Sequence, residues 1–225
     1  MMRAALVTAW DELYDPIADV TTPIMHRYCL QHDYVFLPSR GKFHLDPERD
    51  PSFLTYGDRA KLTIYESLYD LDYDLVVWMD VDTLITNPKI LLEDIIGTRP
   101  FLWTYGPSGP LSGFTMARTL PEVHCFLHHV KHLAADMRSE HDPTGWSDQN
   151  TMRHLMNLPP YDVVAQNIVS CKEAGHCMPV EPYGWEKYRR MVEWEHGDFL
   201  YTVPSIPLDE RLDMLGIKRQ LIYGE

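Results

Sequence analysis

The sequence predicts an α/β fold in which a mostly parallel central sheet is flanked by helices. Short apolar stretches alternate along the chain with longer segments whose apolar residues recur at helical spacing, a pattern typical of α/β proteins. Residues 75–79 (LVVWM) are apolar throughout, as expected for a strand that is covered on both faces. A length of 225 residues suits one domain with a sizeable core, so we expect residues 1–225 to form a single unit.

Five short segments combine apolar, branched and aromatic residues and are therefore expected to be strands. In chain order they are residues 3–8, 34–37, 75–79, 100–105 and 112–116. Residues 38–54, which hold three prolines, one glycine and mixed charges, predict a surface loop.

Helices are expected where apolar residues return every three or four positions and a capping residue precedes them. Asp58 and Asn87 are credible N-caps, and Pro88 suits a first helical turn. The expected helices are residues 17–30, 58–69, a segment starting at 87–88, 121–138, a short helix around 152–156 and a short helix near the C-terminus.

Charge and composition narrow the possible partners. The chain carries 20 basic and 33 acidic residues, a formal charge of −13, which argues against binding along a nucleic-acid backbone. No apolar run approaches the roughly twenty residues of a membrane span, and the first residues turn acidic too early for a signal peptide. The cysteines Cys29, Cys125, Cys171 and Cys177 are unevenly spaced, so these features together predict a cytoplasmic protein with reduced thiols.

Two acids, Asp80 and Asp82, follow the apolar run directly. An unpaired carboxylate is costly to bury, so we expect both at the edge of a cleft where the strand leaves the sheet. Residues i and i+2 of an extended segment point the same way, and two adjacent carboxylates are hard-oxygen ligands suited to Mn²⁺ or Mg²⁺. The alternative is that Asp82 and Thr83 form a polar turn after a core strand.

Further residues are candidates for a ligand site. Thr8 and Ala9 end the first expected strand, where open α/β sheets bind ligands, although a simple strand exit explains them equally well. Arg59 and Lys61 lie in a first helical turn, where the helix dipole disfavours cations, which hints that they face an anion. The alternative is that both are solvated. Gly113 would let a ligand approach the backbone closely, but a plain turn glycine is equally common.

The histidines do not predict a zinc site. His124, His128 and His132 recur every four residues along the expected helix at 121–138. No supporting acids are evident beside them, so we interpret them as the solvated flank of that helix.

Four sequence motifs occur along the chain in an order that resembles a known fold family. They are LVVWMDVDTLITNP at 75–88, SGF at 112–114, WSDQN at 146–150 and WEHGDF at 194–199. Together they resemble the GT-A-fold glycosyltransferases, and in particular the retaining α-galactosyl, α-mannosyl and α-xylosyltransferases and the glycogenin-like enzymes. The resemblance extends over residues 4 to about 207. It implies a Rossmann-like GT-A domain that moves a sugar, with retention, from a UDP- or GDP-sugar to an acceptor. The acceptor is left open: a glycan, a lipid-linked sugar and a protein side chain are all compatible with the sequence, and the negative charge makes a nucleic acid the least favoured choice.

The resemblance also implies roles for single residues. Asp80 and Asp82, with Val81 between them, match the acids that hold Mn²⁺ and the donor's ribose and diphosphate. Asp148 and Gln149 match the pair that lines the reacting face of the sugar, and they are the expected catalytic residues. The other implied donor-binding residues are Thr8 and Ala9 at the base, Arg59 or Lys61 at the donor, and Ser112 and Gly113 at the sugar, where Leu111 replaces the usual Asn.

One departure from these families concerns the metal. They carry a C-terminal histidine as a further ligand a few residues after Gly-Asp-Phe, and here that position falls near Thr202. The nearest histidine, His196, precedes the motif and would lie about 20 Å from Thr202 if residues 198–203 are a strand. Either His196 reaches the metal from a differently shaped loop, or the ion has only Asp ligands, phosphates and water. We therefore keep His196 as a candidate third ligand.

Two other functions are compatible with the sequence. A non-catalytic protein of the same fold would bind sugar nucleotides or glycans, and the missing histidine and Leu111 favour this alternative. A haloacid-dehalogenase-like phosphatase also has two acids after an apolar strand. In this chain, however, Thr83 follows Asp82 directly and Leu84 occupies the position that should be polar.

Overall fold

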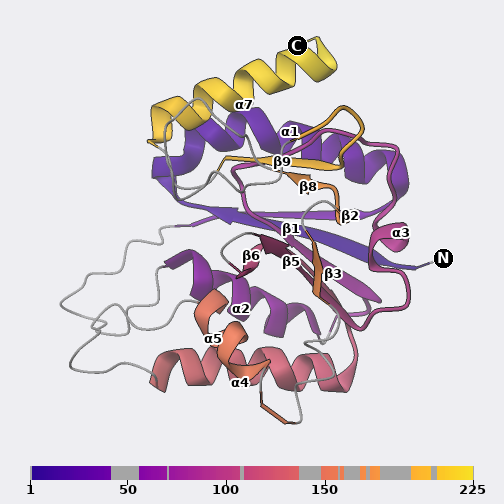
Figure 1. Cartoon of the computed structure of the whole chain (residues 1–225), viewed down its shortest axis with the longest axis vertical. Helices are drawn as coiled ribbons and strands as arrows, with labels where there is room; N and C mark the ends of the chain where they lie inside the picture. The colour runs from indigo at the N-terminus through magenta and orange to yellow at the C-terminus, as the bar shows by residue number, and fades with distance from the viewer. Residues whose placement is uncertain are drawn as a thin grey trace.

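A six-stranded sheet forms the centre of the computed structural model (Figure 1). The described residues are 2–41, 56–69, 71–106, 109–136, 148–156, 158–159, 168–170, 173–177, 194–203 and 207–224. The strands of the sheet are β1 (Ala4–Trp10), β2 (Val35–Arg40), β3 (Leu75–Met79), β5 (Phe101–Gly106), β6 (Gly109–Arg118) and β7 (Ile168–Ser170).

The strands lie in the order β2-β1-β3-β6-β5-β7. β1 pairs in parallel with β2 and β3, and β5 pairs in parallel with β7, while β6 is antiparallel to both of its neighbours. Every strand except β6 therefore runs in the same direction, which confirms the prediction of a mostly parallel sheet.

Two hydrophobic cores cover the two faces of this sheet. Side chains alternate along β3, so Leu75, Val77 and Met79 lie in one core, on the first face, while Val76 and Trp78 lie in the other, on the second face. All five side chains are buried, as the unbroken apolar run predicts. Helices lie on both sides of the sheet in Figure 1, which confirms the expected three layers.

The helices divide between the two faces. α1 packs Ile17 and Tyr28 into the core of the first face, and α4 packs Phe126 and Val130 into the core of the second. His128 and His132 are exposed on α4, as interpreted from the sequence. In contrast, His124 is half-buried and stacks on Tyr69. The helices are α1 (Asp15–His32) and α7 (Leu208–Tyr223) on the first face, and α2 (Tyr56–Tyr69), α4 (Pro121–Asp136) and α5 (Asp148–Leu155) on the second.

A smaller sheet contributes to the core of the first face. Its strands are β4 (Thr83–Ile85), β9 (Leu200–Thr202) and β8 (His176–Cys177), in the order β4-β9-β8. β4 follows the acid pair and runs antiparallel to β9, with Thr83 opposite Thr202 and Ile85 opposite Leu200. The small sheet therefore brings the C-terminal part of the chain to the end of β3.

The helix expected from Asn87 begins later, as α3 (Leu92–Ile96). The Asn87 side chain accepts a hydrogen bond from the Lys89 amide (3.2 Å) and donates one to Gly197 O (2.8 Å). These contacts hold residues 87–90 in a turn beside the small sheet, so the expected N-cap is instead a link between two distant segments.

Other expected boundaries also change. α2 already includes Tyr56, so Asp58 lies inside the helix and is not its N-cap. β2 continues to Arg40, into the segment expected to be a loop. The C-terminal helix α7 runs to Tyr223, and is thus longer than the short helix predicted.

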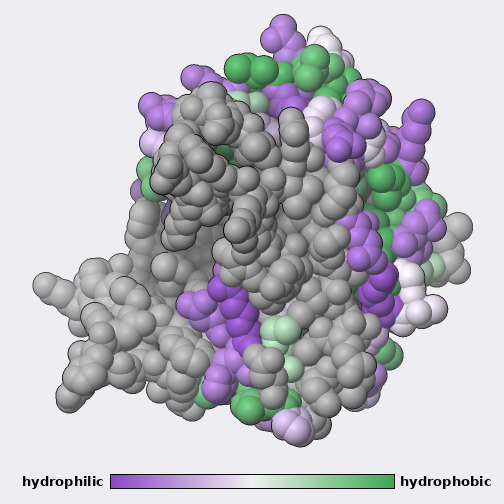
Figure 2. Space-filling view, in the orientation of Figure 1, coloured by the Kyte–Doolittle hydropathy of each residue, from purple (hydrophilic) through white to green (hydrophobic). Residues whose placement is uncertain are grey.

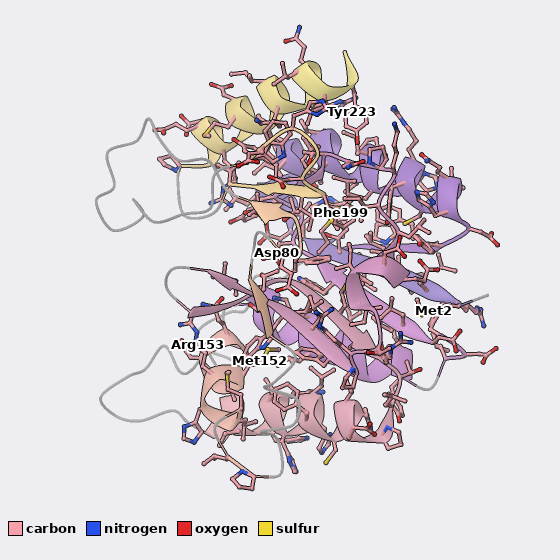
Figure 3. All side chains as sticks on the ribbon, turned by 45° about the vertical axis from the view of Figure 1, so that its right-hand side comes forward. Met2, Asp80, Met152, Arg153, Phe199 and Tyr223 are labelled. Carbon is pink, nitrogen blue, oxygen red and sulfur yellow. The ribbon has the colours of Figure 1, made fainter. Side chains whose placement is uncertain are left out.

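Several contacts fix α7 to the small sheet (Figure 3). The Lys218 ammonium lies 3.7 Å from the centre of the Trp194 ring and 4.7 Å from that of Tyr201, and burial lowers the pKa of Lys218. The Tyr223 hydroxyl donates a hydrogen bond to Ile85 O (2.8 Å). These contacts hold α7 over the strand that follows the acid pair.

On the face shown in Figure 2, the described surface carries hydrophilic side chains with apolar ones interspersed. Ile217 and Leu221 are exposed on α7, as single apolar residues often are on protein surfaces. Within the described ranges, no helix has both the length and the apolar character needed to cross a membrane.

Gly175 and Gly216 allow a matched test of the packing beside β9. Gly175 has a φ of +63°, and a Cβ there would lie 2.8 Å from the Phe199 backbone nitrogen, whereas a Cβ on Gly216 of α7 would meet nothing within 4 Å. We expect Gly175→Ala to lower the free energy of unfolding by about 2 kcal/mol, and Gly216→Ala to raise it by about 0.5–1 kcal/mol. Urea denaturation measures both values, and equal effects would contradict this packing.

Candidate active site

Asp80, the first residue of the acid pair, lies where β3 leaves the central sheet (Figure 3). The Thr83 amide donates a hydrogen bond to Asp80 O (3.0 Å), which closes a turn around Val81 and Asp82. Because the segment turns, its side chains do not alternate as they would in a strand. The expectation that Asp80 and Asp82 point the same way is therefore wrong, and the two carboxylates contact opposite layers of the molecule.

Asp80 is held by β3 and β6. Its carboxylate accepts a hydrogen bond from the Trp78 indole nitrogen (2.5 Å), and its amide donates one to Gly113 O (2.8 Å). The side chain is 42% exposed, so the carboxylate is accessible to a ligand. A Cβ at Gly113 would lie 2.9 Å from Asp80 Oδ2, so the carboxylate needs glycine at this position.

Lys61 brings a positive charge to Asp80 from α2. Its side chain is 3% exposed, and its ammonium lies 3.7 Å from Asp80 Oδ1 and 5.2 Å from the centre of the Trp78 ring. The ammonium also donates a hydrogen bond to Ser112 O (2.9 Å). A buried ammonium requires such partners, and together they direct it toward the acid.

Gln149, in the first turn of α5, extends the same group of contacts. Its side-chain oxygen accepts a hydrogen bond from the Ser112 amide (3.1 Å). The structure therefore connects five of the predicted site residues directly: Asp80, Gly113, Lys61, Ser112 and Gln149.

Asp82 faces the opposite layer. Its Oδ2 accepts a hydrogen bond from Arg211 Nη1 of α7 (2.8 Å), and its backbone oxygen accepts one from the Thr202 hydroxyl (3.3 Å). The Asp82 side chain is only 14% exposed. Burial and the Asp80 carboxylate raise the pKa of Asp82 to about 7, against the opposing effect of Arg211.

Sequence reasoning missed Arg211. Besides Asp82, its guanidinium contacts Tyr14, because Nη1 donates to the hydroxyl (3.4 Å) and Cζ lies 5.6 Å from the ring centre. Tyr14 ends the short helix η1 (Glu12–Tyr14) that follows β1. The one available signal was helical spacing, which places Arg211 on the same side of α7 as the buried Leu215.

The end of β1 lies at the same edge of the sheet as Asp80. β1 pairs in parallel with β3 as far as Val7, opposite Trp78, so Thr8 and Ala9 extend beyond the last pair. Thr8 is completely buried, and Ala9 is partly buried. Both predicted base-binding residues are therefore placed next to the turn that carries the acids.

Asp15, at the start of α1, connects the ends of β1 and β2. Its carboxylate accepts hydrogen bonds from Trp10 Nε1 (3.0 Å) and from Arg40 Nε (2.7 Å) and Nη2 (2.5 Å). The Arg40 hydrogen bond is the main cause of the lowered pKa of Asp15. These contacts hold the ends of β1 and β2 together beside the candidate site.

Arg59 and Asp148 are placed by their backbone alone. Arg59 lies in α2 two residues before Lys61, and Asp148 is the first residue of α5, next to Gln149. Their side chains lie outside the described part of the chain, so the roles assigned to them stay predictions.

His196 does not join the acid pair. β9 is antiparallel to β4, so Thr202 lies opposite Thr83 and next to Asp82. His196 precedes β9 and therefore lies beyond the far end of β4. The interpretation of His196 as a third metal ligand is wrong, because the strand register places Thr202 where the resembling families carry their histidine.

The site offers a cation two carboxylates. Asp80 and Asp82 provide the oxygen ligands that Mn²⁺ and Mg²⁺ prefer. Burial is the main cause of the raised pKa of Asp82, and the Asp80 carboxylate adds a repulsion between like charges that a divalent cation would relieve. Across the described residues, no three His, Cys, Asp or Glu side chains form a metal-binding group. An ion bound by Asp80 and Asp82 would thus have further coordination positions for oxygen atoms of a ligand or of water.

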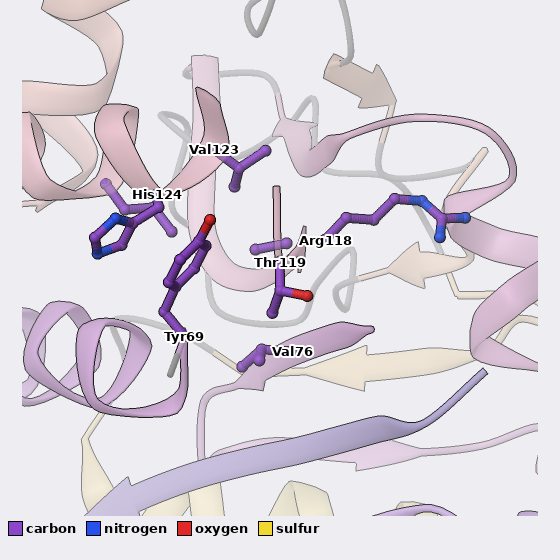
Figure 4. Close-up of a pocket in the computed structure, with 8 residues that line it drawn as sticks. Tyr69, Val76, Arg118, Thr119, Val123 and His124 are labelled. Carbon is purple, nitrogen blue, oxygen red and sulfur yellow. The ribbon is translucent and has the colours of Figure 1, made fainter. Parts of the chain in front are cut away.

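A separate small pocket lies toward the other end of β3 (Figure 4). Tyr69, Val76, Thr119 and His124 are among the residues that line it. The space accommodates about one water molecule, which is too little for a sugar or a nucleotide. This pocket therefore has no part in the candidate site.

Replacing Asp82 with Asn tests its electrostatic environment in metal-free protein. The pKa of Asp82 is raised from 3.8 to about 7 in the folded protein. Below pH 3.8 the carboxyl is protonated in both states and its ionisation costs no stability. As pH rises from 3.8 through about 7, the unfolded state ionises more readily than the folded state, and the folded protein loses stability. Relative to wild type, Asp82→Asn should therefore gain stability between these pH values, by at most about 4 kcal/mol. Urea denaturation in EDTA at several pH values measures this change. Parallel stability curves for the two proteins would contradict the prediction.

Solved structures with similar folds are glycosyltransferases, although no protein-family model and no curated protein sequence matches the chain. A glycosyltransferase involved in glycosylation of the major capsid of PBCV-1 has a TM-score of 0.62 and 11% identity, with 96% of this chain and 99% of that chain covered. The galactosyltransferase LgtC, in complex with donor and acceptor sugar analogues, has a TM-score of 0.55 and 11% identity, with 95% of each chain covered. An active-site mutant of LgtC has a TM-score of 0.54, at the same identity, with 94% of this chain and 95% of that chain covered. The chain therefore has the GT-A-type fold of these glycosyltransferases.

Proposed function

We propose that this protein is a glycosyltransferase that moves a sugar from a nucleotide-diphosphate sugar to an acceptor, with retention, and with Mn²⁺ or Mg²⁺ bound by Asp80 and Asp82. The observation that carries the proposal is that α2 and β6 meet at Asp80 through Lys61 and Gly113. Gln149 joins α5 to this group through its hydrogen bond with the Ser112 amide. The group lies at the carboxyl end of a central strand, where α/β sheets bind ligands. The shared fold supports the same conclusion.

The nucleotide is proposed to lie along the ends of β1 and β3. Its base would lie against the end of β1 at Ala9, which is partly buried, whereas the Thr8 side chain is completely buried and does not reach a ligand there. Its diphosphate would lie at the acid pair. A divalent cation there stabilises the negative charge that develops on a diphosphate as the sugar leaves. Lys61 provides a buried positive charge at the same place, and Arg59 is proposed to grip the donor from the same helix.

The sugar is proposed to lie between β6 and α5. Gly113 lets the Asp80 carboxylate lie directly against the β6 backbone, so a sugar bound beside this acid would lie close to β6. The Ser112 amide fixes the side chain of Gln149 at 3.1 Å, which would let this residue orient the donor or support an oxocarbenium-like transition state. Asp148, the preceding residue of α5, is proposed to act with it.

The acceptor is proposed to be a glycan, a lipid-linked sugar or a protein. LgtC binds an acceptor sugar analogue, and the PBCV-1 enzyme takes part in the glycosylation of a capsid. Both observations concern other proteins, and they support a carbohydrate or glycoprotein acceptor for this chain.

A second candidate function is non-catalytic binding of a sugar nucleotide or a glycan. Thr202 favours it, because this residue lies beside Asp82 where the resembling enzymes carry a metal-binding histidine. Slow hydrolysis of a bound donor to free sugar and nucleotide would decide in favour of the enzyme.

Donor binding and hydrolysis test the proposed activity. Calorimetry with a panel of UDP- and GDP-sugars in Mn²⁺ should find at least one that binds and is slowly hydrolysed. Asp80→Asn should lower the hydrolysis rate about 100-fold because the cation loses a ligand. Asp94→Asn changes an exposed acid of α3 and should have no effect. Absence of binding across the panel would refute the proposal, whereas phosphate release from a simple ester would favour a phosphatase.

Gly113→Ala tests the geometry around Asp80. The added Cβ would lie 2.9 Å from Asp80 Oδ2 and must displace the carboxylate. We expect the affinity for UDP or GDP in Mn²⁺ to fall about 10-fold, with little change in Tm because Asp80 is 42% exposed. Calorimetry measures the affinity, and Gly216→Ala provides a control. Wild-type affinity in Gly113→Ala would show that the position of Asp80 does not matter for binding.

A further inference from the structure

Arg211 and Asp82 form a buried ion pair within the proposed donor site. Arg211 Nη1 lies 2.8 Å from Asp82 Oδ2, and the two side chains are 10% and 14% exposed. A buried ion pair contributes little net stability, since the desolvation of both charges offsets their attraction. Lys218 and Tyr223 also anchor α7 independently. Attachment of α7 to the rest of the protein therefore does not explain why Arg211 and Asp82 form an ion pair.

The charges of the site indicate another role. Among the described side chains, the acids Asp80 and Asp82 are matched by the cations Lys61 and Arg211. A divalent cation alone would add two positive charges beside Arg211, which is unfavourable. A cation that arrives with a diphosphate keeps the charges balanced. The charges of the site therefore favour binding of the divalent cation and the diphosphate together.

Arg211 lies where it can contact either partner. Its guanidinium lies between Asp82 of the β3 turn and Tyr14 of η1, next to the end of β1, where we place the nucleotide. The planar guanidinium binds two oxygens of a phosphate as readily as those of a carboxylate. A diphosphate at the acid pair would therefore compete with Asp82 for Arg211.

We propose that Arg211 exchanges partners when the donor binds: it holds Asp82 in the donor-free protein and turns to the diphosphate when nucleotide and cation are bound. The exchange couples the two ligands, because a cation alone must compete with Arg211 for Asp82, and a diphosphate removes this competitor. The inference rests on the proposed function, since it requires a nucleoside diphosphate at this site.

Calorimetry of the full chain at pH 8 tests the exchange. Mn²⁺ alone should bind Arg211→Met about 10-fold more tightly than wild type, because Asp82 is released. The increase in Mn²⁺ affinity caused by UDP or GDP should be about 10-fold smaller in this variant. Arg219→Met removes another arginine of α7, one that donates to Val20 O (3.4 Å), and should leave both quantities unchanged.

Four outcomes would overturn the exchange. If Arg211→Met binds Mn²⁺ no more tightly than wild type, or keeps the full coupling, the exchange is refuted while the proposed function stands. If Arg211→Met does not fold, Arg211→Lys decides, because an ammonium cannot bind two phosphate oxygens as the guanidinium does, and the coupling should fall at least about threefold. Wild-type coupling in Arg211→Lys would then refute the exchange. A wild type that binds neither UDP nor GDP in Mn²⁺ refutes the proposed function and the exchange with it.

Discussion

The cost of burying charge at the end of β3 governs the arrangement of the site. β3 is buried on both faces, so a carboxylate within it would lose its hydration. The chain turns directly after β3, and each acid receives a cation from a different layer. Lys61 of α2 lies at Asp80, and Arg211 of α7 binds Asp82. The need to pair each acid with a cation therefore links the position of α2 and of α7 to the chemistry of the acid pair.

This arrangement gives the two acids different properties. Asp80 is 42% exposed and is fixed by Trp78 and the β6 backbone, so its carboxylate is ready to bind a ligand. Asp82 is 14% exposed and is already bound by Arg211. A cation therefore meets one carboxylate that is partly exposed and one that is largely buried and bound by Arg211. The position of α7 matters to the site for this reason, although α7 lies far from the acids in sequence.

The sequence predicts those parts of the structure that depend on short-range patterns. The buried strand β3 follows from an apolar run, and α1 and α4 follow from helical periodicity. Long-range contacts cause the differences. Asn87 does not cap a helix because it binds Gly197, and β4 exists through its pairing with β9. Asp80, Lys61 and Gly113 could be inferred from local chemistry, whereas Arg211 could not, because its partner precedes it by 129 residues.

Thr202 shows how the site differs from the enzymes it resembles. Its hydroxyl donates to Asp82 O (3.3 Å) and accepts a hydrogen bond from the Thr83 hydroxyl (3.2 Å), so it stabilises the turn that carries Asp82. Hydrogen bonds of Thr202 thus hold the turn, and the protein offers a cation one ligand fewer than the enzymes it resembles. In the proposed reaction, Lys61 and Arg211 compensate by placing two positive charges beside the diphosphate. Stabilisation of the leaving group is then divided between the cation and the protein itself.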